Sequence, residues 1–403
     1  MDHVIVIGAG QAGASCVAKL RNGGFEGDVT LIGAEPVAPY QRPPLSKAYL
    51  MGDMALERLF LRPETFYAEN RITLRTDARV AAIDTASQTV TLADGESLTY
   101  SALVLATGSE PRRLPAAVGG TLDHVFTVRD LSDANMMAPH FRKGARLLVI
   151  GGGYIGLEAA AVAAKLGLQV TLVEMAERIL QRVAAPQTSD YFRALHRAHG
   201  VDIREGVGLV RLLGETAVTG AALSDDTMLG IDFAIVGVGI LPVTGLAEAA
   251  GIDTDNGIAT DAQGRASAPN VWAAGDCASF PYQAGRIRLE SVPNAIDQAE
   301  VVAENIMGAG KSYLAKPWFW SDQYDVKLQI AGLNTGYTDV VSRIGAGRTA
   351  SYWYYLDGNL LAVDAMNDPR AYMIGKRLIE AGKTADPAVV ADADADLKPL
   401  LQA

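Results

Sequence analysis

Short β-branched runs alternate with helical stretches over much of the chain. The apolar run at 3–7 is followed by a glycine-rich turn, a helical stretch and a second apolar run at 28–32. The same strand–helix–strand order returns over 146–173. Strands that alternate with helices predict parallel sheets covered by helices. The pattern therefore predicts two α/β domains of one design.

The C-terminal quarter has a different pattern. Aromatic residues become frequent from about Tyr313, and Asp357-Gly358 separates two β-rich runs. An Asp-Gly pair between such runs predicts a hairpin, and Asp94-Gly95 predicts another one earlier in the chain. We therefore expect a small α+β domain at the C-terminal end. The Ala/Asp-rich segment 385–396 is expected to be solvated and loosely held.

The first glycine-rich turn has the spacing of a dinucleotide-binding fingerprint, Gly-x-Gly-x-x-Gly. Gly8 permits the tight turn, Gly10 lets a pyrophosphate approach the backbone, and Gly13 lets the helix pack on the strand. The helix N-terminus supplies free N–H groups to the phosphates. Glu35 follows the second strand, where an acid suits a ribose hydroxyl. The segment therefore predicts a bound dinucleotide.

The second fingerprint runs from Gly151 to Gly156. Glu174 follows 18 residues later, where a carboxylate binds the 2′-hydroxyl of NAD and disfavours the 2′-phosphate of NADP. Arg178 and Arg182 lie four and eight residues after Glu174, and their positive charges leave binding of NADP as an alternative. Two fingerprints in one chain predict two nucleotides, a flavin and a nicotinamide.

Composition narrows the class of protein. The net charge of −11 argues against nucleic-acid binding, which needs an excess of Lys and Arg. Two cysteines, Cys16 and Cys277, cannot build a disulfide framework or a thiolate metal cluster. His196 and His199 lack further ligands nearby, so we expect surface residues and no metal site. With no signal peptide and no apolar membrane span, a cytoplasmic protein that binds no membrane is expected.

Several motifs together resemble a known family. In chain order they are Gly8–Gly13, Tyr40–Lys47, Leu105–Gly108, Gly151–Glu158, Ala274–Asp276, Glu290–Ala295 and Trp318–Gln323. The chain resembles the FAD-containing, NADH-dependent ferredoxin reductases of bacterial oxygenase systems. The resemblance implies a glutathione-reductase-like fold of two Rossmann-like domains and a small α+β domain. The expected boundaries are 1–112 with 243–312 for FAD, 113–242 for NAD, and 313–403 for the C-terminal domain.

The resemblance also implies cofactor contacts. Glu35 is implied near the adenosine ribose of FAD, although the family pattern has its acid at the position of Ala34. The other implied FAD residues are Gly8, Gly10, Ala12, Gly13, Arg42, Lys47, Val80, Ala106, Thr107, Gly108, Arg129, Gly275, Asp276 and Val292. The implied NAD residues are Gly151, Gly153, Tyr154, Ile155, Gly156, Glu174 and Gly239.

Three further residues are implied in catalysis. Lys47 and Glu158 are expected to form an ion pair beside flavin N5, with Trp320 near the flavin. Other interpretations stay open from the residues alone. Lys47 could be a solvated charge, Glu158 could stabilise its own helix N-terminus, and Trp320 could be a core aromatic.

The absence of redox-active cysteines at two positions bears on which reaction the flavin is expected to carry out. A flavin disulfide reductase needs a Cys pair after the first fingerprint, where only Cys16 stands, and peroxidase relatives need a Cys at the position of Ser46. Electrons are therefore expected to leave the flavin directly for an outside acceptor. The resemblance implies that this acceptor is a [2Fe–2S] ferredoxin, which takes the electrons singly and supplies an oxygenase, a cytochrome P-450 above all. The alternatives are a rubredoxin reductase and a nucleotide-responsive binding protein of the apoptosis-inducing-factor type. A monomer is expected.

Docking of an acidic ferredoxin on a chain of net charge −11 needs a local basic patch. The candidate residues are Arg286, Arg288, Lys327, Arg370, Lys376 and Arg377. Each of them could equally be an independent, solvated charge.

Overall fold

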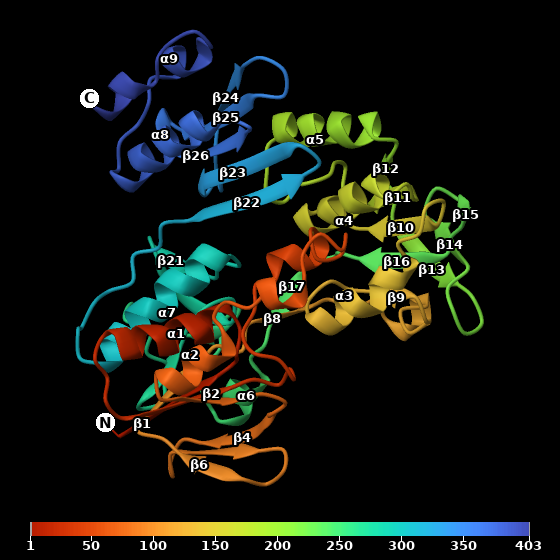
Figure 1. Ribbon diagram of the computed structural model, residues 1–403. Helices are drawn as coiled ribbons and strands as arrows, with labels where there is room; N and C mark the ends of the chain where they lie inside the picture. Colours follow the sequence, from red (N-terminus) through yellow and green to blue (C-terminus); the bar gives the residue numbers. More distant parts are fainter. Residues whose placement is uncertain (1, 403) are drawn as a thin grey trace. The chain divides into compact units, whose positions relative to one another are not determined.

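The computed structural model describes residues 2–402, and the chain divides into two compact units (Figure 1). The first unit comprises Met1–Gln41, Ala55–Glu110 and Ile240–Pro317. The second unit comprises Arg42–Met54, Pro111–Gly239 and Trp318–Ala403. The three-domain boundaries expected from the sequence stay a prediction.

The first unit is built on a parallel five-stranded sheet of order β19-β7-β1-β2-β3. Its strands are β1 (His3–Ile7), β2 (Asp28–Ile32), β3 (Ile72–Arg75), β7 (Ala102–Leu105) and β19 (Val271–Ala273). Helices α1 (Gln11–Asn22) and α7 (Val292–Ile306) share one apolar core with the sheet, in which Leu20 and Val302 are almost fully buried. The predicted first α/β unit is confirmed.

Smaller elements complete the first unit. They are α2 (Glu64–Glu69), α6 (Gly245–Ala249), β4 (Val80–Asp84), β5 (Thr89–Leu92), β6 (Ser97–Thr99), β8 (Ser109–Pro111), β17 (Ile240–Pro242), β18 (Ile258–Ala259), β20 (Ala278–Tyr282) and β21 (Gly285–Ile287). Strands β5 and β6 form the hairpin predicted at Asp94-Gly95, where Gly95 has a φ of 93°.

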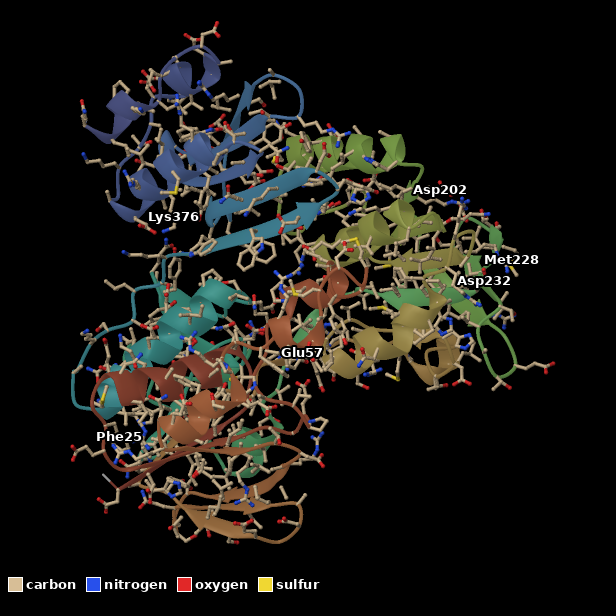
Figure 2. The ribbon with its side chains drawn as sticks, viewed as in Figure 1. Phe25, Glu57, Asp202, Met228, Asp232 and Lys376 are labelled. Carbon is tan, nitrogen blue, oxygen red and sulfur yellow. The ribbon has the colours of Figure 1, made fainter. Side chains whose placement is uncertain are left out.

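The second unit contains the other parallel sheet, of order β12-β11-β10-β16-β9. Its elements are β9 (Val125–Phe126), β10 (Arg146–Ile150), β11 (Gln169–Glu174), β12 (Asp202–Glu205), β16 (Phe233–Val236), α3 (Leu131–Met137), α4 (Tyr154–Lys165) and α5 (Pro186–Ala198). A small antiparallel sheet of β13 (Leu209–Leu213), β14 (Gly220–Leu223) and β15 (Met228–Gly230) follows β12 in the chain. Asp232, labelled in Figure 2, pairs with Arg146 at 2.7 Å between Oδ1 and Nη2.

The C-terminal part is an antiparallel sheet of order β22-β23-β26-β25-β24, as the α+β prediction required. Its elements are β22 (Trp318–Gln323), β23 (Val326–Gly332), β24 (Asp339–Ile344), β25 (Ala350–Leu356), β26 (Asn359–Met366), α8 (Pro369–Glu380) and α9 (Pro387–Ala391). Phe192 of α5 and Tyr354 of β25 belong to one buried cluster. This shared core explains why the second parallel sheet and the C-terminal sheet form one unit.

The segment 385–396 is mostly exposed, as expected, but the expectation that it is loosely held is wrong. Ala385 and Val390 are fully buried, and α9 lies in this segment. Arg343 of β24 donates from its guanidinium to the main-chain oxygens of Ala393 at 2.9 Å and Ala395 at 2.8 Å. Small and acidic side chains expose the main chain, so one arginine can bind it at several points.

No helix among residues 2–402 is both long and apolar enough to cross a membrane.

Candidate functional site

Helices α1 and α4 begin at glycines that leave the first helical turn uncapped. Their N-cap residues, Gly10 and Gly153, are extended and provide no side-chain cap. By contrast, Asp130, Ser291 and Asp368 cap α3, α7 and α8 with side-chain oxygens. A Cβ atom added to Gly10 or Gly153 would meet no atom within 4 Å. Both N-termini therefore present main-chain donors beside an open glycine, which fits the predicted pyrophosphate contacts; these contacts stay predictions.

The remaining fingerprint glycines are required by close packing. A Cβ atom on Gly8 would lie 2.1 Å from the main-chain oxygen of Ala106, and one on Gly13 would lie 1.9 Å from that of Gly8. In the second fingerprint, a Cβ atom on Gly156 would lie 2.2 Å from the oxygen of Gly151. The two turns share one local geometry, which matches two Rossmann-type nucleotide sites.

Glu35 and Glu174, the two acids predicted to bind a ribose, differ in their contacts. Glu35 is half-buried, and its Oε2 accepts a hydrogen bond from the Tyr40 hydroxyl at 2.5 Å. Glu174 ends β11, and its carboxylate accepts from the backbone N–H groups of Gly152 at 2.7 Å and Ala176 at 2.8 Å. Glu174 is thus fixed against the glycine turn. The positions of both acids fit the predicted ribose contacts, which stay predictions.

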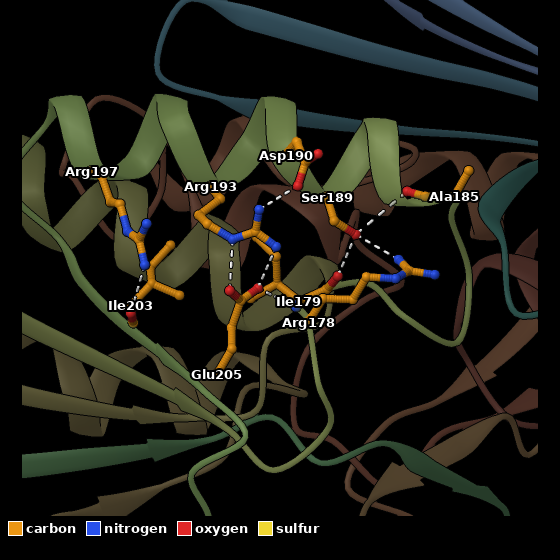
Figure 3. A network of polar contacts seen from close by, with 9 residues as sticks. All are labelled: Arg178, Ile179, Ala185, Ser189, Asp190, Arg193, Arg197, Ile203 and Glu205. Carbon is orange, nitrogen blue, oxygen red and sulfur yellow. Dashed lines mark hydrogen bonds and ion pairs between the residues drawn. The ribbon is translucent and has the colours of Figure 1, made fainter. Parts of the chain in front are cut away.

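Arg178, one of the two arginines that left NADP binding open, takes part in a structural network around α5 (Figure 3). Its Nη1 donates to the Oγ of Ser189 at 2.6 Å. Glu205 of β12 pairs with Arg193 at 2.6 Å between Oε2 and Nε, and accepts from the N–H of Ile179 at 2.8 Å. The network ties the loop after Glu174 to α5 and β12.

Most of the other expected flavin residues of the first unit follow strands β1, β7 and β19 of its parallel sheet. Asp276 accepts a hydrogen bond from the Oγ of Ser109 at 2.9 Å, and Thr107 donates to the oxygen of Val243 at 2.7 Å. A Cβ atom on Gly275 would lie 2.9 Å from that of Ala12. The buried residues Val80 and Ala106 and the half-buried Gly108 and Val292 complete the expected set.

Arg42 and Arg129, also expected to contact FAD, lie together in the second unit. The Nη1 of Arg42 donates to the main-chain oxygen of Arg129 at 2.8 Å. The N–H of Arg129 donates to the Oδ2 of Asp133 at 2.8 Å. Burial raises the pKa of Asp133, and the nearby Asp130 adds to the increase. The main chain of Arg129 is therefore held on both sides.

Lys47 and Glu158 form the expected ion pair, with 2.6 Å between Nζ and Oε2. The Glu158 side chain is 6% exposed and that of Lys47 is 18% exposed, so Lys47 is not a solvated surface charge. Glu158 also accepts from the Oγ of Ser46 at 3.1 Å and from the Oγ of Ser321 at 2.7 Å. With three partners outside α4, Glu158 does more than stabilise its own helix N-terminus.

Lys47 was expected beside Glu158, but Ser321 and the residues linked to it were missed from the sequence as site residues. Ser321 and Gln323 lie two apart in β22, a spacing that places both on one face of the strand. His196 was expected at the surface, and this is wrong. It is fully buried, with 2.7 Å between its Nε2 and the Oε1 of Gln323. His199 is exposed as expected and stacks on Tyr324, with ring centroids 3.7 Å apart.

Trp320 lies in β22 among other aromatic residues and is half-buried. Its ring centroid is 5.6 Å from that of Trp318 and 6.4 Å from that of Phe319. Tyr154, the first residue of α4, has its ring 5.0 Å from that of Phe319, whereas Ile155 is 43% exposed. The last expected NAD residue, Gly239, follows β16 with a φ of 103°.

Both cysteines are free and fully buried. Burial raises the pKa of Cys16 to about 12 and also raises the pKa of Cys277. A buried thiol that stays protonated is a poor nucleophile. In the described part of the chain, no three His, Cys, Asp or Glu residues are grouped so that they could hold a metal ion.

The candidate docking cations differ in their surroundings. Arg288 is 9% exposed, pairs with Glu290 at 2.6 Å between Nη2 and Oε1, and donates to the main-chain oxygen of Asp276 at 3.1 Å, so it supports the first unit. Arg286 donates to the main-chain oxygens of Thr260 and Ser279. Arg370 lies 3.9 Å from Asp396, measured from Nη1 to Oδ1, and Lys376, labelled in Figure 2, pairs with Glu380. Lys327 and Arg377 are exposed and make no ion pair within residues 2–402.

Comparison with known proteins identifies the family. Residues 2–299 match the pyridine nucleotide-disulphide oxidoreductase model, and residues 318–401 match the reductase C-terminal model. The chain is 43% identical to a ferredoxin–NAD(P)(+) reductase of Sphingomonas sp, with 96% of this chain and 94% of the relative covered. It is 40% identical to putidaredoxin reductase CamA of Pseudomonas putida, with 100% and 97% covered.

Solved structures agree with this result. The covalent putidaredoxin reductase–putidaredoxin complex matches with a TM-score of 0.96 at 40% identity, covering 100% of this chain and 98% of that one. The ferredoxin reductase for the CYP199A2 system from Rhodopseudomonas palustris matches with a TM-score of 0.95 at 39% identity, covering 99% of both chains. The predicted fold class is confirmed, and the chain belongs to the pyridine nucleotide-disulphide oxidoreductase family.

Proposed function

We propose that this chain is a flavoprotein reductase that passes electrons from NADH through FAD, one at a time, to a [2Fe–2S] ferredoxin. The ferredoxin would supply an oxygenase, in the first place a cytochrome P-450. The chain is an FAD-containing oxidoreductase that uses NADH, and its relatives include reductases named for ferredoxin, putidaredoxin and rhodocoxin. The matching complex joins such a reductase to putidaredoxin, an example of the proposed partner class.

The observation that carries the proposal is the combination of two open nucleotide turns with no reactive thiol. Family members that reduce disulfides relay electrons through cysteines, but Cys16 and Cys277 are buried, and Ser46 donates to Glu158. A bound FAD accepts two electrons from NADH and can release them singly. Without a thiol relay, the electrons pass directly from the flavin to an external one-electron carrier.

The residues of the first unit provide the FAD site in this proposal. The main-chain N–H groups after Gly10 hold the pyrophosphate, and Glu35 binds the adenosine ribose. Asp276 binds the ribitol and Val292 supports the flavin ring. Asp276 is held in place by the Ser109 hydroxyl, which limits the rotation of its carboxylate.

The residues of the second unit provide the NAD site and the charges for hydride transfer. The turn Gly151–Gly156 holds the pyrophosphate, and Glu174 binds the adenine ribose. Glu158 orients Lys47 and the nicotinamide, and Lys47 stabilises the negative charge that develops during reduction. Trp320 lies near the flavin on the side where the ferredoxin accepts electrons. The chain acts as a cytoplasmic monomer, and its two unpaired cysteines agree with a reducing compartment.

A panel of purified acceptors tests the proposal. The FAD-loaded protein and NADH would be mixed with [2Fe–2S] ferredoxins, rubredoxins and no carrier, and flavin reoxidation followed by stopped-flow absorbance. We expect at least one ferredoxin to reoxidise the flavin many times faster than dioxygen does. Faster reaction with rubredoxins would identify a rubredoxin reductase instead. Slow reoxidation with every carrier would contradict a reductase role and favour a nucleotide-responsive binding protein.

A further inference from the structure

A continuous chain of side-chain hydrogen bonds leads from Glu158 to Tyr324 within the second unit. Glu158 Oε1 and Ser321 Oγ are 2.7 Å apart, and Ser321 Oγ and Gln323 Nε2 are 3.2 Å apart. Gln323 Oε1 lies 2.7 Å from His196 Nε2, and His196 Nδ1 lies 3.2 Å from the Tyr324 hydroxyl. The chain therefore connects α4, β22 and α5.

Four members of this chain are buried. Ser321 and His196 have no exposed surface, Gln323 is 1% exposed and Glu158 is 5% exposed. Asp322, between Ser321 and Gln323, is exposed, as the alternation of a strand requires. Buried polar side chains are kept where each one finds a partner, and here the partners are one another.

The direction of the chain follows from the Glu158 carboxylate, which can only accept hydrogen bonds when ionised. Ser321 must donate to it, so the Ser321 oxygen accepts from the Gln323 amide nitrogen. The Gln323 oxygen then accepts from His196 Nε2–H, which leaves His196 Nδ1 to accept from Tyr324. Burial lowers the pKa of His196 to about 4, so the imidazole is neutral near pH 7, as this pattern needs. Every link thus donates toward Glu158.

The two carboxylate oxygens of Glu158 have different hydrogen-bond partners. Oε2 receives Lys47 and Ser46, whereas Oε1 receives Ser321. The last torsion of a glutamate side chain is broad, so contacts at one oxygen alone would leave the carboxylate free to rotate. Ser321 removes that freedom, and Gln323 and His196 hold the Ser321 hydroxyl in place.

We propose that Ser321, Gln323 and His196 are positioning residues that orient the Glu158 carboxylate and thereby place Lys47 for hydride transfer from NADH. The inference rests on the proposed function, in which the Lys47–Glu158 pair assists that step. None of the three residues needs to touch a nucleotide. Their loss should lower the rate of flavin reduction and leave the affinity for NADH unchanged.

The test compares Ser321→Ala with Ser321→Thr, which keeps the hydroxyl. Flavin reduction is followed by stopped flow at increasing NADH, with each rate referred to the FAD that the visible spectrum shows to be bound. We expect Ser321→Ala to reduce the limiting rate about tenfold or more, with the apparent Kd for NADH changed less than about twofold. Ser321→Thr should recover most of the rate. Ser351→Ala removes another fully buried serine of the same sheet and is the matched control, with the limiting rate unchanged.

The distal end of the chain supplies a second variant pair. His196→Leu removes the donor to Gln323, whereas the amide of His196→Asn can still supply one. As with the Ser321 variants, we expect the variant without the hydrogen-bonding group to be the slower one. Flavin reduction at saturating NADH should be slower in His196→Leu than in His196→Asn. A residue that only stabilises the fold would lower the thermal midpoint of both variants without this difference in limiting rate.

A double-mutant cycle separates the inference from the proposed function. In a Lys47→Met background, Ser321→Ala should slow flavin reduction by less than about twofold, because it acts through the same pair. If Lys47→Met alone leaves flavin reduction unchanged, the proposed role of the pair fails. If Lys47→Met slows it but Ser321→Ala does not, the positioning role is overturned and the proposed function stands. Equal slowing by Ser321→Ala in both backgrounds also overturns the positioning role.

Discussion

The Glu174 carboxylate accepts a hydrogen bond from the backbone N–H of Gly152 at 2.7 Å. Its other oxygen accepts from the N–H of Ala176 at 2.8 Å. The acid at the end of β11 is therefore held against the glycine turn by two backbone hydrogen bonds. A carboxylate held in this way keeps its negative charge where the adenine ribose of a dinucleotide is expected.

This contact bears on the choice of coenzyme. A 2′-phosphate would face a fixed carboxylate, at a cost of about 1–3 kcal/mol or more. We expect kcat/KM for NADH to exceed that for NADPH at least tenfold, and Glu174→Gln to narrow the ratio. Exposed Glu177, three residues further on, provides the control variant Glu177→Gln, which should keep the ratio. Equal efficiencies of the two coenzymes in the unmodified protein would contradict this prediction.

Breaking the Lys47–Glu158 pair should affect both stability and rate. Lys47→Met leaves a buried carboxylate without its cation, which typically costs about 3–5 kcal/mol in the free energy of unfolding. Flavin reduction should slow while the visible spectrum shows FAD still bound. The control is Lys311→Met, which breaks the Lys311–Glu304 pair. Its lysine is 57% exposed, and exposed ion pairs contribute only about 0–1 kcal/mol to the free energy of unfolding. If Lys47→Met reduced its flavin as fast as the unmodified protein, the proposed role of Lys47 in hydride transfer would be contradicted.

Lys327 is the docking candidate in the second unit to test first, since it is exposed and makes no ion pair among the described residues. Charge attraction between exposed groups decays over about 10 Å at 0.1 M salt, so ferredoxin reduction should fall steeply as salt rises. Lys327→Glu should raise KM for ferredoxin and leave flavin reduction by NADH unchanged. Lys143→Glu, another exposed charge of this unit, is the control. Ferredoxin turnover that stays flat in salt would instead favour apolar docking around Trp320.

Arg343 should hold the C-terminal segment in place. Its guanidinium binds main-chain oxygens of that segment, and hydrogen bonds to charged groups contribute about 1.5–3 kcal/mol each. Arg343→Gln should speed amide hydrogen exchange and proteolytic cleavage within 385–397. Arg348→Gln breaks an ion pair whose partners, Arg348 and Asp325, are 42% and 67% exposed, so the segment should stay protected. Equal protection in both variants would show that apolar burial of Val390 holds the segment alone.

The buried carboxyl of Asp364 should make stability depend on pH. Burial raises its pKa from 3.8 to about 6, although the hydroxyls of Tyr354 and Thr188 both donate to it. A raised carboxyl pKa favours folding in the protonated form, so this contribution is complete below pH 3.8 and is lost as pH rises through 6.

Asp364→Asn should remove this dependence. Relative to the variant, the unmodified protein should lose up to about 3 kcal/mol of unfolding free energy between pH 4 and 7, with no further change above. Urea unfolding at several pH values measures the difference. Asp339→Asn, at an exposed position of β24, should track the unmodified protein throughout. Parallel curves for Asp364→Asn and the unmodified protein would contradict the prediction.

Local sequence determined the two nucleotide turns. Gly13 is needed because the main-chain oxygen of Gly8 leaves no room for a Cβ atom, and the strand and helix that set this contact adjoin in the chain. The same holds for Glu174, which stands at the end of a strand next to its turn. Gly8 lies in the same turn as Gly13, but the oxygen that excludes its Cβ atom belongs to Ala106, which the pairing of β1 with β7 brings alongside. Features that depend on contacts between residues close in sequence could be predicted residue by residue.

Tertiary structure decided the surroundings of Glu158 and the state of the C-terminal segment. His196 has a polar side chain on a helix with charged neighbours, and it is buried where Gln323 of β22 and Tyr324 pack against it. Segment 385–396 has a composition typical of a solvated end, yet Arg343, more than forty residues earlier, binds its main chain. Hydrophobic pattern and spacing predict which elements form, but the partner of a buried polar group is set by which distant elements pack together.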